Sequence, residues 1–155
     1  MTERFSFADI PQRTGSTFTS PWITVDQRRM ALFDESTFYD PAEYGWDVDS
    51  FPDDMLEGFH LLSLVPYLVN LAARLDDPSA FTLNYGLDRV RFVTPVFAGE
   101  RLRAHGVVAE VRSKRDGYLV LNRITVEVEG RERPGFTADL WALVLPRIPE
   151  NLSTT

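Results

Sequence analysis

The second half of the chain alternates between apolar and polar side chains. The clearest run is 118–129, where apolar residues and one asparagine occupy every second position and polar residues occupy most of the others. This period of two predicts strands with one buried face. The pattern places strands at about 82–97, 100–113, 117–129 and 134–145. Short links join these strands, so we expect an antiparallel sheet.

The first half of the chain predicts helices instead. Residues 55–75 are apolar around nearly the whole circumference of a helix, which is typical of a buried helix. Pro66 lies inside this segment and is expected to kink or break it. Thr24 followed by Gln27 is a capping-box pattern, which predicts that an earlier helix starts near Val25.

These elements predict one α+β domain over residues 1–155, in which a long antiparallel sheet wraps around one central helix. Residues 1–21 show little periodicity and are expected to form an N-terminal arm. Residues 36–54 combine acids with aromatic side chains, and the aromatic content argues against disorder.

The net charge of −7 is concentrated in one segment. Nine of the 23 acids lie between Asp34 and Glu57, a stretch that contains no Lys, Arg or His. This acidic field makes nucleic acid an unexpected partner. The chain has no cysteine, no apolar run long enough to span a membrane and no secretory signal pattern, so we expect a cytoplasmic protein.

Two segments resemble the MaoC-like and NodN-like dehydratase family. The sequence LEGFHLLSL at 56–64 is similar to the family segment that reads His-Gly, apolar residues and Ser-Leu, with Gly58 at the family glycine and Ser63 at the family serine. The sequence NYGLDRVRFVTPVFAG at 84–99 resembles the family run Asn-Tyr-Gly, Val-Arg-Phe, Pro-Val and Gly. The resemblance covers about residues 23–145 and implies the hotdog fold.

The resemblance also implies a reaction, which is the hydration of a trans-2-enoyl-CoA to a (3R)-hydroxyacyl-CoA or its reverse. In the family, an Asp and a His five residues apart hold the water, and backbone N–H groups near the helix glycine, here Gly58, bind the thioester oxygen. Coenzyme A enters as part of the substrate, with no other cofactor. Hotdog chains associate in pairs, so a homodimer or a heteromeric hotdog pair is expected.

The family's Asp and His are absent from the matching positions. Aligning residues 33–37 with the family's helix end places Tyr39 at the Asp position and Tyr44 at the His position. Anchoring the alignment on the loop proline instead places Phe38 and Glu43 there. Neither alignment supplies a histidine, so the acid/base set of this chain must differ.

Several residues are candidates to replace that pair. Asp40 is our first choice as the base, although a loop acid is more often a turn residue. Tyr39 or Tyr44 would orient the water, with packing under the loop as the favoured alternative for both. His60 is a reserve acid or base, with packing in a core or an interface as the alternative. Glu57 precedes the helix N–H groups and is either a cap or the acid of a thioesterase.

Other residues are candidates for holding the substrate. Ser63 and Asn84 are expected to contact it, with a buried structural role as the alternative. Arg89 and Arg91 are expected to bind the phosphates of coenzyme A, which the acidic loop would repel. No spacing of His, Asp or Glu predicts a metal site.

Three functions therefore remain open at the level of sequence. The first is a hydro-lyase acting on an acyl-CoA or a similar thioester, with an atypical acid/base set. The second is a hotdog thioesterase that activates water with Glu57 or Asp40. The third is a non-catalytic hotdog subunit that binds acyl-CoA or pairs with an active partner chain.

Overall fold

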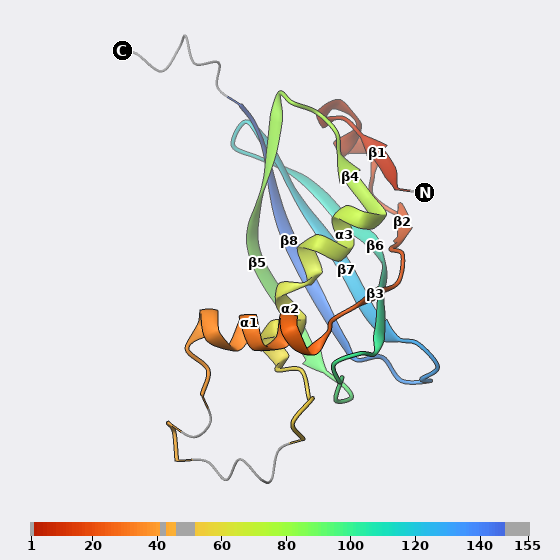
Figure 1. The fold of residues 1–155 in the computed structure, drawn as a ribbon. Helices are drawn as coiled ribbons and strands as arrows, with labels where there is room; N and C mark the ends of the chain where they lie inside the picture. The colour runs from red at the N-terminus through yellow and green to blue at the C-terminus, as the bar shows by residue number, and fades with distance from the viewer. Residues whose placement is uncertain (1, 41–42, 46–51, 148–155) are drawn as a thin grey trace.

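A curved antiparallel sheet wraps around two short helices in the computed structural model, which describes residues 2–40, 43–45 and 52–147 (Figure 1). The elements within these ranges are β1 (Glu3–Phe5), η1 (Phe7–Gln12), β2 (Thr17–Thr19), β3 (Ile23–Thr24), α1 (Gln27–Thr37), α2 (Gly58–Ser63), α3 (Val65–Ala72), β4 (Ala73–Leu75), β5 (Ala80–Phe92), β6 (Arg101–Lys114), β7 (Gly117–Val128) and β8 (Phe136–Pro146). The strand order is β2-β6-β7-β8-β5, and β3 also pairs with β6. The predicted α+β arrangement of a long sheet around a central helix is confirmed.

The alternating pattern of the sequence produces the two faces of this sheet. In β7 the side chains of Ile124, Val126 and Val128 are buried against the helices, whereas Arg123 is exposed. Each of the predicted strands appears, and its ends shift by only a few residues. Register shifts in β5 and β6 mark β-bulges, which increase the curvature of the sheet.

The central apolar segment is divided as its proline predicted. Helix α2 ends at Ser63, Leu64 forms the junction, and Pro66 occupies the first turn of α3, where a helix does not need the missing N–H. Leu68 in α3 is fully buried in the core between the helices and the sheet. The predicted helix start near residue 55 was too early, because Glu57 caps α2 and the helix begins at Gly58.

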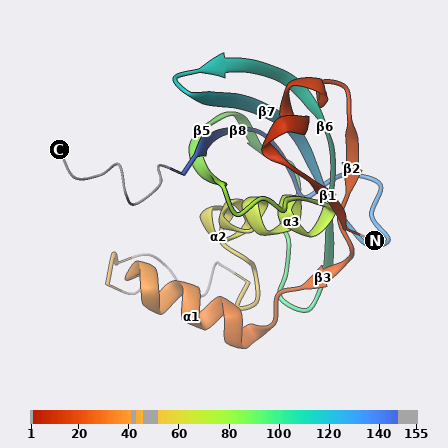
Figure 2. The ribbon, with the colours of Figure 1, turned by 90° about the horizontal axis from the view of Figure 1, so that it is seen from above.

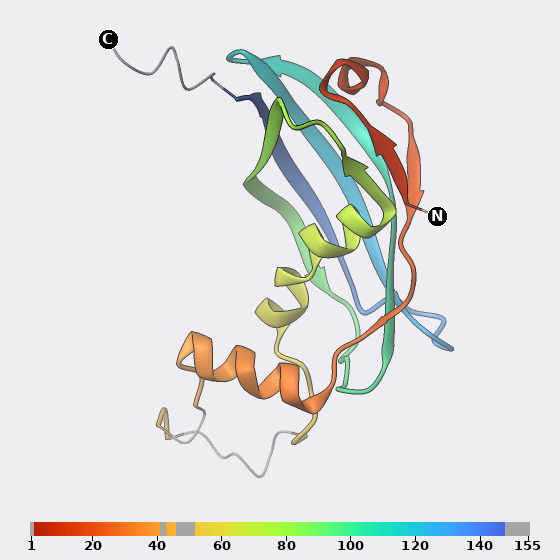
Figure 3. The same cartoon turned by 45° about the horizontal axis from the view of Figure 1, so that its top comes forward.

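Helix α1 lies apart from the sheet, with α2 and α3 between them (Figures 2 and 3). Its N-cap is Asp26, whose carboxylate accepts a hydrogen bond from the backbone N–H of Arg29 at 2.8 Å. The capping box predicted at Thr24 is therefore wrong. Thr24 belongs to β3 and pairs with Arg101 of β6, so sheet pairing takes the residue that the local pattern assigned to the cap.

Residues expected to form an arm without periodicity contain three short elements. Strand β1 pairs in parallel with β4, and β2 pairs with β6. Between them, Ile10 of η1 is buried in a second apolar cluster. The guanidinium of Arg13 pairs with Glu3 and lies 3.9 Å from the ring centroid of Phe5. This segment closes the end of the core opposite α1.

Strand β5 forms one edge of the main sheet. Large apolar side chains are exposed along it: Leu83, Tyr85, Leu87, Val90 and Phe92. Within the described residues, no helix is both long and apolar enough to cross a membrane.

Candidate functional site

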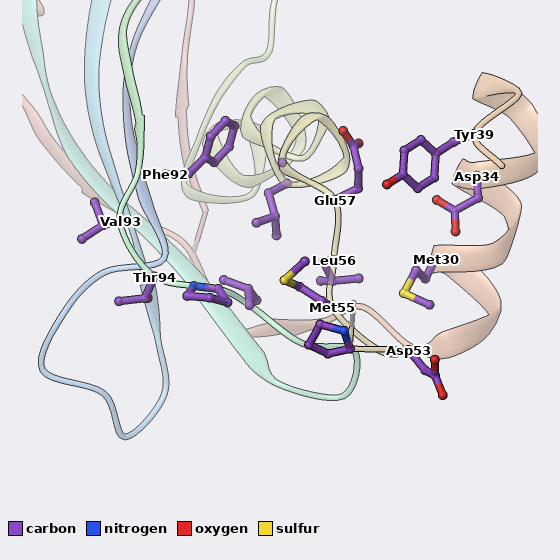
Figure 4. A pocket seen from close by; sticks show the side chains of 15 residues that line it. Met30, Asp34, Tyr39, Asp53, Met55, Leu56, Glu57, Phe92, Val93 and Thr94 are labelled. Atoms are coloured by element: carbon purple, nitrogen blue, oxygen red, sulfur yellow. The ribbon is translucent and has the colours of Figure 1, made fainter. Parts of the chain in front are cut away.

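A cleft of about 560 Å³ opens at the N-terminal end of α2. It lies between α1, the segment that leads into α2 and the segment that follows β5 (Figure 4). The described residues that line it are Met30, Asp34, Tyr39, residues 52–53 and 55–58, Leu61 and residues 92–96. Three segments that are separate in the sequence thus meet at the start of the central helix.

Glu57 directly precedes α2, where it both caps the helix and lines the cleft. Its carboxylate accepts a hydrogen bond from the backbone N–H of His60 at 3.1 Å, which makes it the N-cap of the helix. The same side chain lines the cleft. The N-terminal end of a helix favours an anion, so the fold holds a carboxylate in a fixed place here.

Gly58 is the first residue of α2 and lines the cleft beside Glu57. A Cβ atom at this position would lie 3.0 Å from two ring carbons of Phe92. The glycine therefore allows the aromatic ring at the end of β5 to approach the start of the helix closely. This close packing joins the two walls of the cleft.

Asp34 and Tyr39 reach the cleft from the α1 side and point toward Glu57 (Figure 4). Burial raises the pKa of the Asp34 carboxyl; the negative charge of Glu57 adds to this rise and the nearby His60 opposes it. Burial also raises the pKa of the Tyr39 hydroxyl, and the charges of Glu57 and Asp34 raise it further. At neutral pH Tyr39 thus keeps its proton, and Asp34 takes up a proton more readily than an ordinary aspartate.

The charged side chains among the described residues that line the cleft are all acidic. Among the described lining residues, Asp34, Asp53 and Glu57 are acids, and none is Lys, Arg or His. An anionic group such as a phosphate is repelled from this space. A neutral acyl thioester is not.

His60 is not one of the described residues that line the cleft. The residue is only 5% exposed, and its ring stacks on Phe33 of α1 with 4.4 Å between the centroids and 6° between the planes. Burial lowers the pKa of the imidazole, against the opposing effect of Asp34 and Glu57. Its Nδ1 atom is buried and has no hydrogen-bond partner among the described residues. The ring is thus a neutral packing group in this structure.

The loop candidates lie mostly outside the cleft. Asp40 is exposed, and Tyr44 is half-exposed and donates a hydrogen bond from its hydroxyl to the carbonyl oxygen of Phe38 at 3.1 Å. Phe38 and Glu43, from the second alignment, are exposed as well. Only Tyr39 among these residues lines the cleft. The roles predicted for Asp40 and Tyr44 remain predictions.

Ser63 and Asn84 come together at a different place. Both line a second cavity, of about 460 Å³, between the helices and β5. The hydroxyl of Ser63 donates a hydrogen bond to the carbonyl oxygen of His60 at 2.7 Å. Their predicted contact with the substrate therefore requires that the substrate extends into this second cavity.

The predicted phosphate-binding arginines lie on β5, outside the lining of the first cleft. The Arg89 guanidinium donates from Nε to the buried carboxylate of Asp139 at 2.8 Å, and Arg123 contacts the same carboxylate. The backbone of Arg89 has a positive φ of 49° and lies at a register shift of β5. Arg91 is exposed two residues further along the strand.

The sequence did not single out Asp34 or Phe92 as site residues. Asp34 was visible only as one acid of a long acidic run, and Phe92 as one apolar residue of a strand. A signal for Asp34 was present, because Met30 and Asp34 are four residues apart and so share one face of a helix. Among the described residues, no group of three or more His, Cys, Asp or Glu is placed to hold a metal ion.

Known proteins that are similar to this chain in sequence include a nodulation protein and a dehydratase. No family model matches the chain. The chain is 34% identical over 153 residues to nodulation protein N of Rhizobium leguminosarum bv. viciae, a match that covers 94% of both proteins. It is 31% identical over 144 residues to 3-hydroxyacyl-thioester dehydratase Z of Mycobacterium tuberculosis, with 86% of this chain and 92% of the relative covered.

Solved structures with low sequence identity share the fold. The monoamine oxidase regulatory protein of Archaeoglobus fulgidus superposes with a TM-score of 0.68 at 22% identity, covering 96% of this chain and 99% of that protein. The 3R-hydroxyacyl-ACP dehydratase complex HadBC of Mycobacterium tuberculosis gives a TM-score of 0.61 at 16% identity, covering 85% of this chain and 96% of that one. These similarities confirm the fold that the sequence motifs predicted.

Proposed function

Because this chain belongs to the MaoC-like and NodN-like dehydratase family, we propose that it is an acyl-thioester hydro-lyase whose acid/base groups are Glu57, Asp34 and Tyr39. The observation that carries this proposal is the meeting of two carboxylates and a phenol in one cleft beside Gly58, the family's glycine. The relative named 3-hydroxyacyl-thioester dehydratase Z supports the reaction class. The substrate is a 2-enoyl or 3-hydroxyacyl thioester.

Hydration follows from the positions of these groups. The Glu57 carboxylate takes a proton from water while the water oxygen forms a bond to C3 of the enoyl thioester. The electron pair of the C2–C3 double bond moves toward the thioester carbonyl, whose oxygen faces the backbone N–H of Gly58. The helix cap fixes Glu57, so the base does not have to reorganise during the step.

Asp34 completes the addition as the acid. Its raised pKa allows it to carry a proton, which it gives to C2 as the carbonyl re-forms. Tyr39 keeps its proton and orients the water between the two carboxyl groups. Transfer of the proton from Glu57 back to Asp34 through a water molecule returns the site to its starting state, and dehydration is the same path in reverse.

The charge of the cleft limits which part of the substrate enters it. The acyl chain and the thioester are neutral, whereas the phosphates of coenzyme A, or of a carrier's phosphopantetheine arm, are anionic and stay outside. Arg89 and Arg91 on β5 remain our proposed phosphate contacts for an acyl-CoA substrate. Arg89 then has to share its guanidinium with Asp139, which leaves Arg91 as the stronger candidate.

The edge of the sheet supports pairing with a second hotdog chain. A long edge strand offers unpaired backbone groups, and β5 adds a row of exposed apolar side chains to them. The HadBC neighbour is itself a complex. We therefore propose that β5 pairs with β5 of a second copy or with the corresponding strand of another hotdog chain, which would place the second cavity at the interface.

The test of the reaction class uses the wild-type chain alone and mixed short and long enoyl-CoAs. Loss of enoyl absorbance without release of free thiol is the expected result. Release of thiol at an equal or greater rate would replace the hydro-lyase by a thioesterase, a second function that the fixed Glu57 carboxylate beside Gly58 supports. Absence of both activities, together with binding of an acyl-CoA or of a second hotdog chain, would establish the non-catalytic subunit.

A further inference from the structure

His60 is joined to both walls of the cleft, although the proposed reaction gives it no chemical step. Its backbone N–H donates to the Glu57 carboxylate at 3.1 Å, on the α2 side. Its ring stacks face to face on Phe33, on the α1 side. One residue therefore contacts the base directly and also contacts the helix that carries the acid.

Met30 and Phe33 are two residues of α1 that contact other described parts of the chain. None of the residues of α1 is buried, and the helix lies apart from the sheet (Figure 2). Met30 packs its N-terminal half against the core. Phe33, one turn further along, reaches the His60 ring. Asp34 follows directly after Phe33, and Tyr39 follows the end of the helix. A shift of α1 at the Phe33–His60 stack would therefore move both groups.

We propose that Phe33 and His60 form a positioning pair, whose ring stack sets the distance from Asp34 on α1, and from Tyr39 just after α1, to Glu57 at the start of α2. This inference rests on the proposed function, because it assigns a purpose to the relative placement of those groups. A displacement of about 1 Å between reacting groups costs up to about a hundredfold in rate. A contact that fixes α1 over α2 therefore controls turnover without touching the substrate.

The surroundings of the His60 ring indicate that it acts by stacking and not as an acid or a base. His60 is 5% exposed, it is not among the described residues that line the cleft, and its Nδ1 has no hydrogen-bond partner within the described part of the chain. What His60 supplies is therefore a flat ring, together with a backbone N–H that any residue provides. A phenylalanine in its place offers the same flat surface to Phe33.

The experiment compares four variants of the full chain: His60→Ala, His60→Phe, Phe33→Ala and Leu32→Ala. Leu32 is exposed on α1 and does not line the cleft, so it controls for a generic loss from the helix. In His60→Ala and Phe33→Ala we expect kcat/KM for enoyl-thioester hydration to fall about tenfold to a hundredfold. His60→Phe is expected to regain most of the wild-type value, and Leu32→Ala to retain it.

Amide hydrogen exchange over residues 27–37 provides the second readout, which does not need turnover. Exchange in α1 should quicken in His60→Ala and Phe33→Ala, and should stay at the wild-type rate in the other two variants. Unchanged exchange or unchanged kcat/KM in Phe33→Ala would overturn the proposal. So would a His60→Phe variant as impaired as His60→Ala, because His60 would then act chemically.

The two proposals fail in different ways. If the wild type hydrates no enoyl thioester, the proposed function falls, and the exchange series alone still decides whether the stack holds α1. If the wild type is active but α1 exchanges equally in all variants, the hydro-lyase remains and the positioning pair falls.

Discussion

Substituting Gly58 by alanine separates the stability of the fold from the shape of the cleft. The added Cβ would lie 3.0 Å from two carbons of the Phe92 ring, and this ring is 46% exposed. A half-exposed ring can turn aside, at a cost of about 0.5–1.5 kcal/mol for a strained side-chain angle. Alanine offsets this with up to about 1 kcal/mol of helix propensity. We expect the free energy of unfolding to change by less than about 1 kcal/mol, and the Tm by less than about 4 °C.

Gly106→Ala is the matched control for this substitution. A Cβ at Gly106 would lie 2.2 Å from the backbone carbonyl oxygen of Arg123 on the neighbouring strand, which cannot turn aside. Overpacking of this kind costs about 3 kcal/mol or more, and lowers the Tm by about 6–12 °C. Thermal unfolding followed by circular dichroism measures both variants under the same conditions.

Relative to the stability that is lost, Gly58→Ala should reduce activity more than Gly106→Ala does. In Gly58→Ala the displaced Phe92 ring changes the cleft beside the proposed oxyanion position, so we expect kcat/KM to fall about tenfold while the chain stays folded. If Gly58→Ala lost as much stability as Gly106→Ala, the packing described at the start of α2 would be wrong. If it kept full activity, the cleft would not be where the substrate reacts.

Further predictions concern charge, the N-terminal segment and the sheet edge. Burial raises the pKa of Asp34, so its ionised form opposes folding above that pKa; Asp34→Asn should therefore stabilise the chain in urea at neutral pH, and the gain should vanish near about pH 4. Arg13→Ala removes the pair with half-exposed Glu3 and the contact with Phe5, and should cost about 1–2 kcal/mol of unfolding free energy in urea. Leu87→Asp on β5 should leave the chain folded by circular dichroism, yet shift the mass found by light scattering from a dimer to 17.7 kDa; a wild-type chain that is already monomeric would remove the dimer proposal.

The fold was largely predictable because its hydrophobic patterns are regular and extend over many residues. The period-two runs and the all-apolar segment with Pro66 depend on burial, which acts on every residue of an element. The short elements were missed for the opposite reason. Thr24 carries a strong local signal for a helix cap, but pairing with Arg101 of β6, far along the chain, decides its conformation.

The site was predictable only in part, because it depends on where one helix lies against another. Gly58 and Glu57 stand at a motif, so the sequence identified them. Asp34 and Phe92 enter the cleft through tertiary packing of α1 and β5. The spacing of Met30 and Asp34 indicates a shared helix face, but it does not show what that face packs against. Asp40 was favoured by its place in the loop, and its exposure in the folded chain is likewise a result of packing.

If the chemistry takes place in the cleft of Glu57, Asp34 and Tyr39, then Glu57→Gln and Asp40→Asn must differ sharply in activity. The glutamine keeps an oxygen that accepts the hydrogen bond from the backbone of His60, so helix α2 stays capped while the base is lost. We predict that kcat/KM for hydration of an enoyl-CoA falls by about two to four orders of magnitude in Glu57→Gln and stays within about threefold of wild type in Asp40→Asn. A full loss in Asp40→Asn with activity retained in Glu57→Gln would instead show that the base lies in the loop.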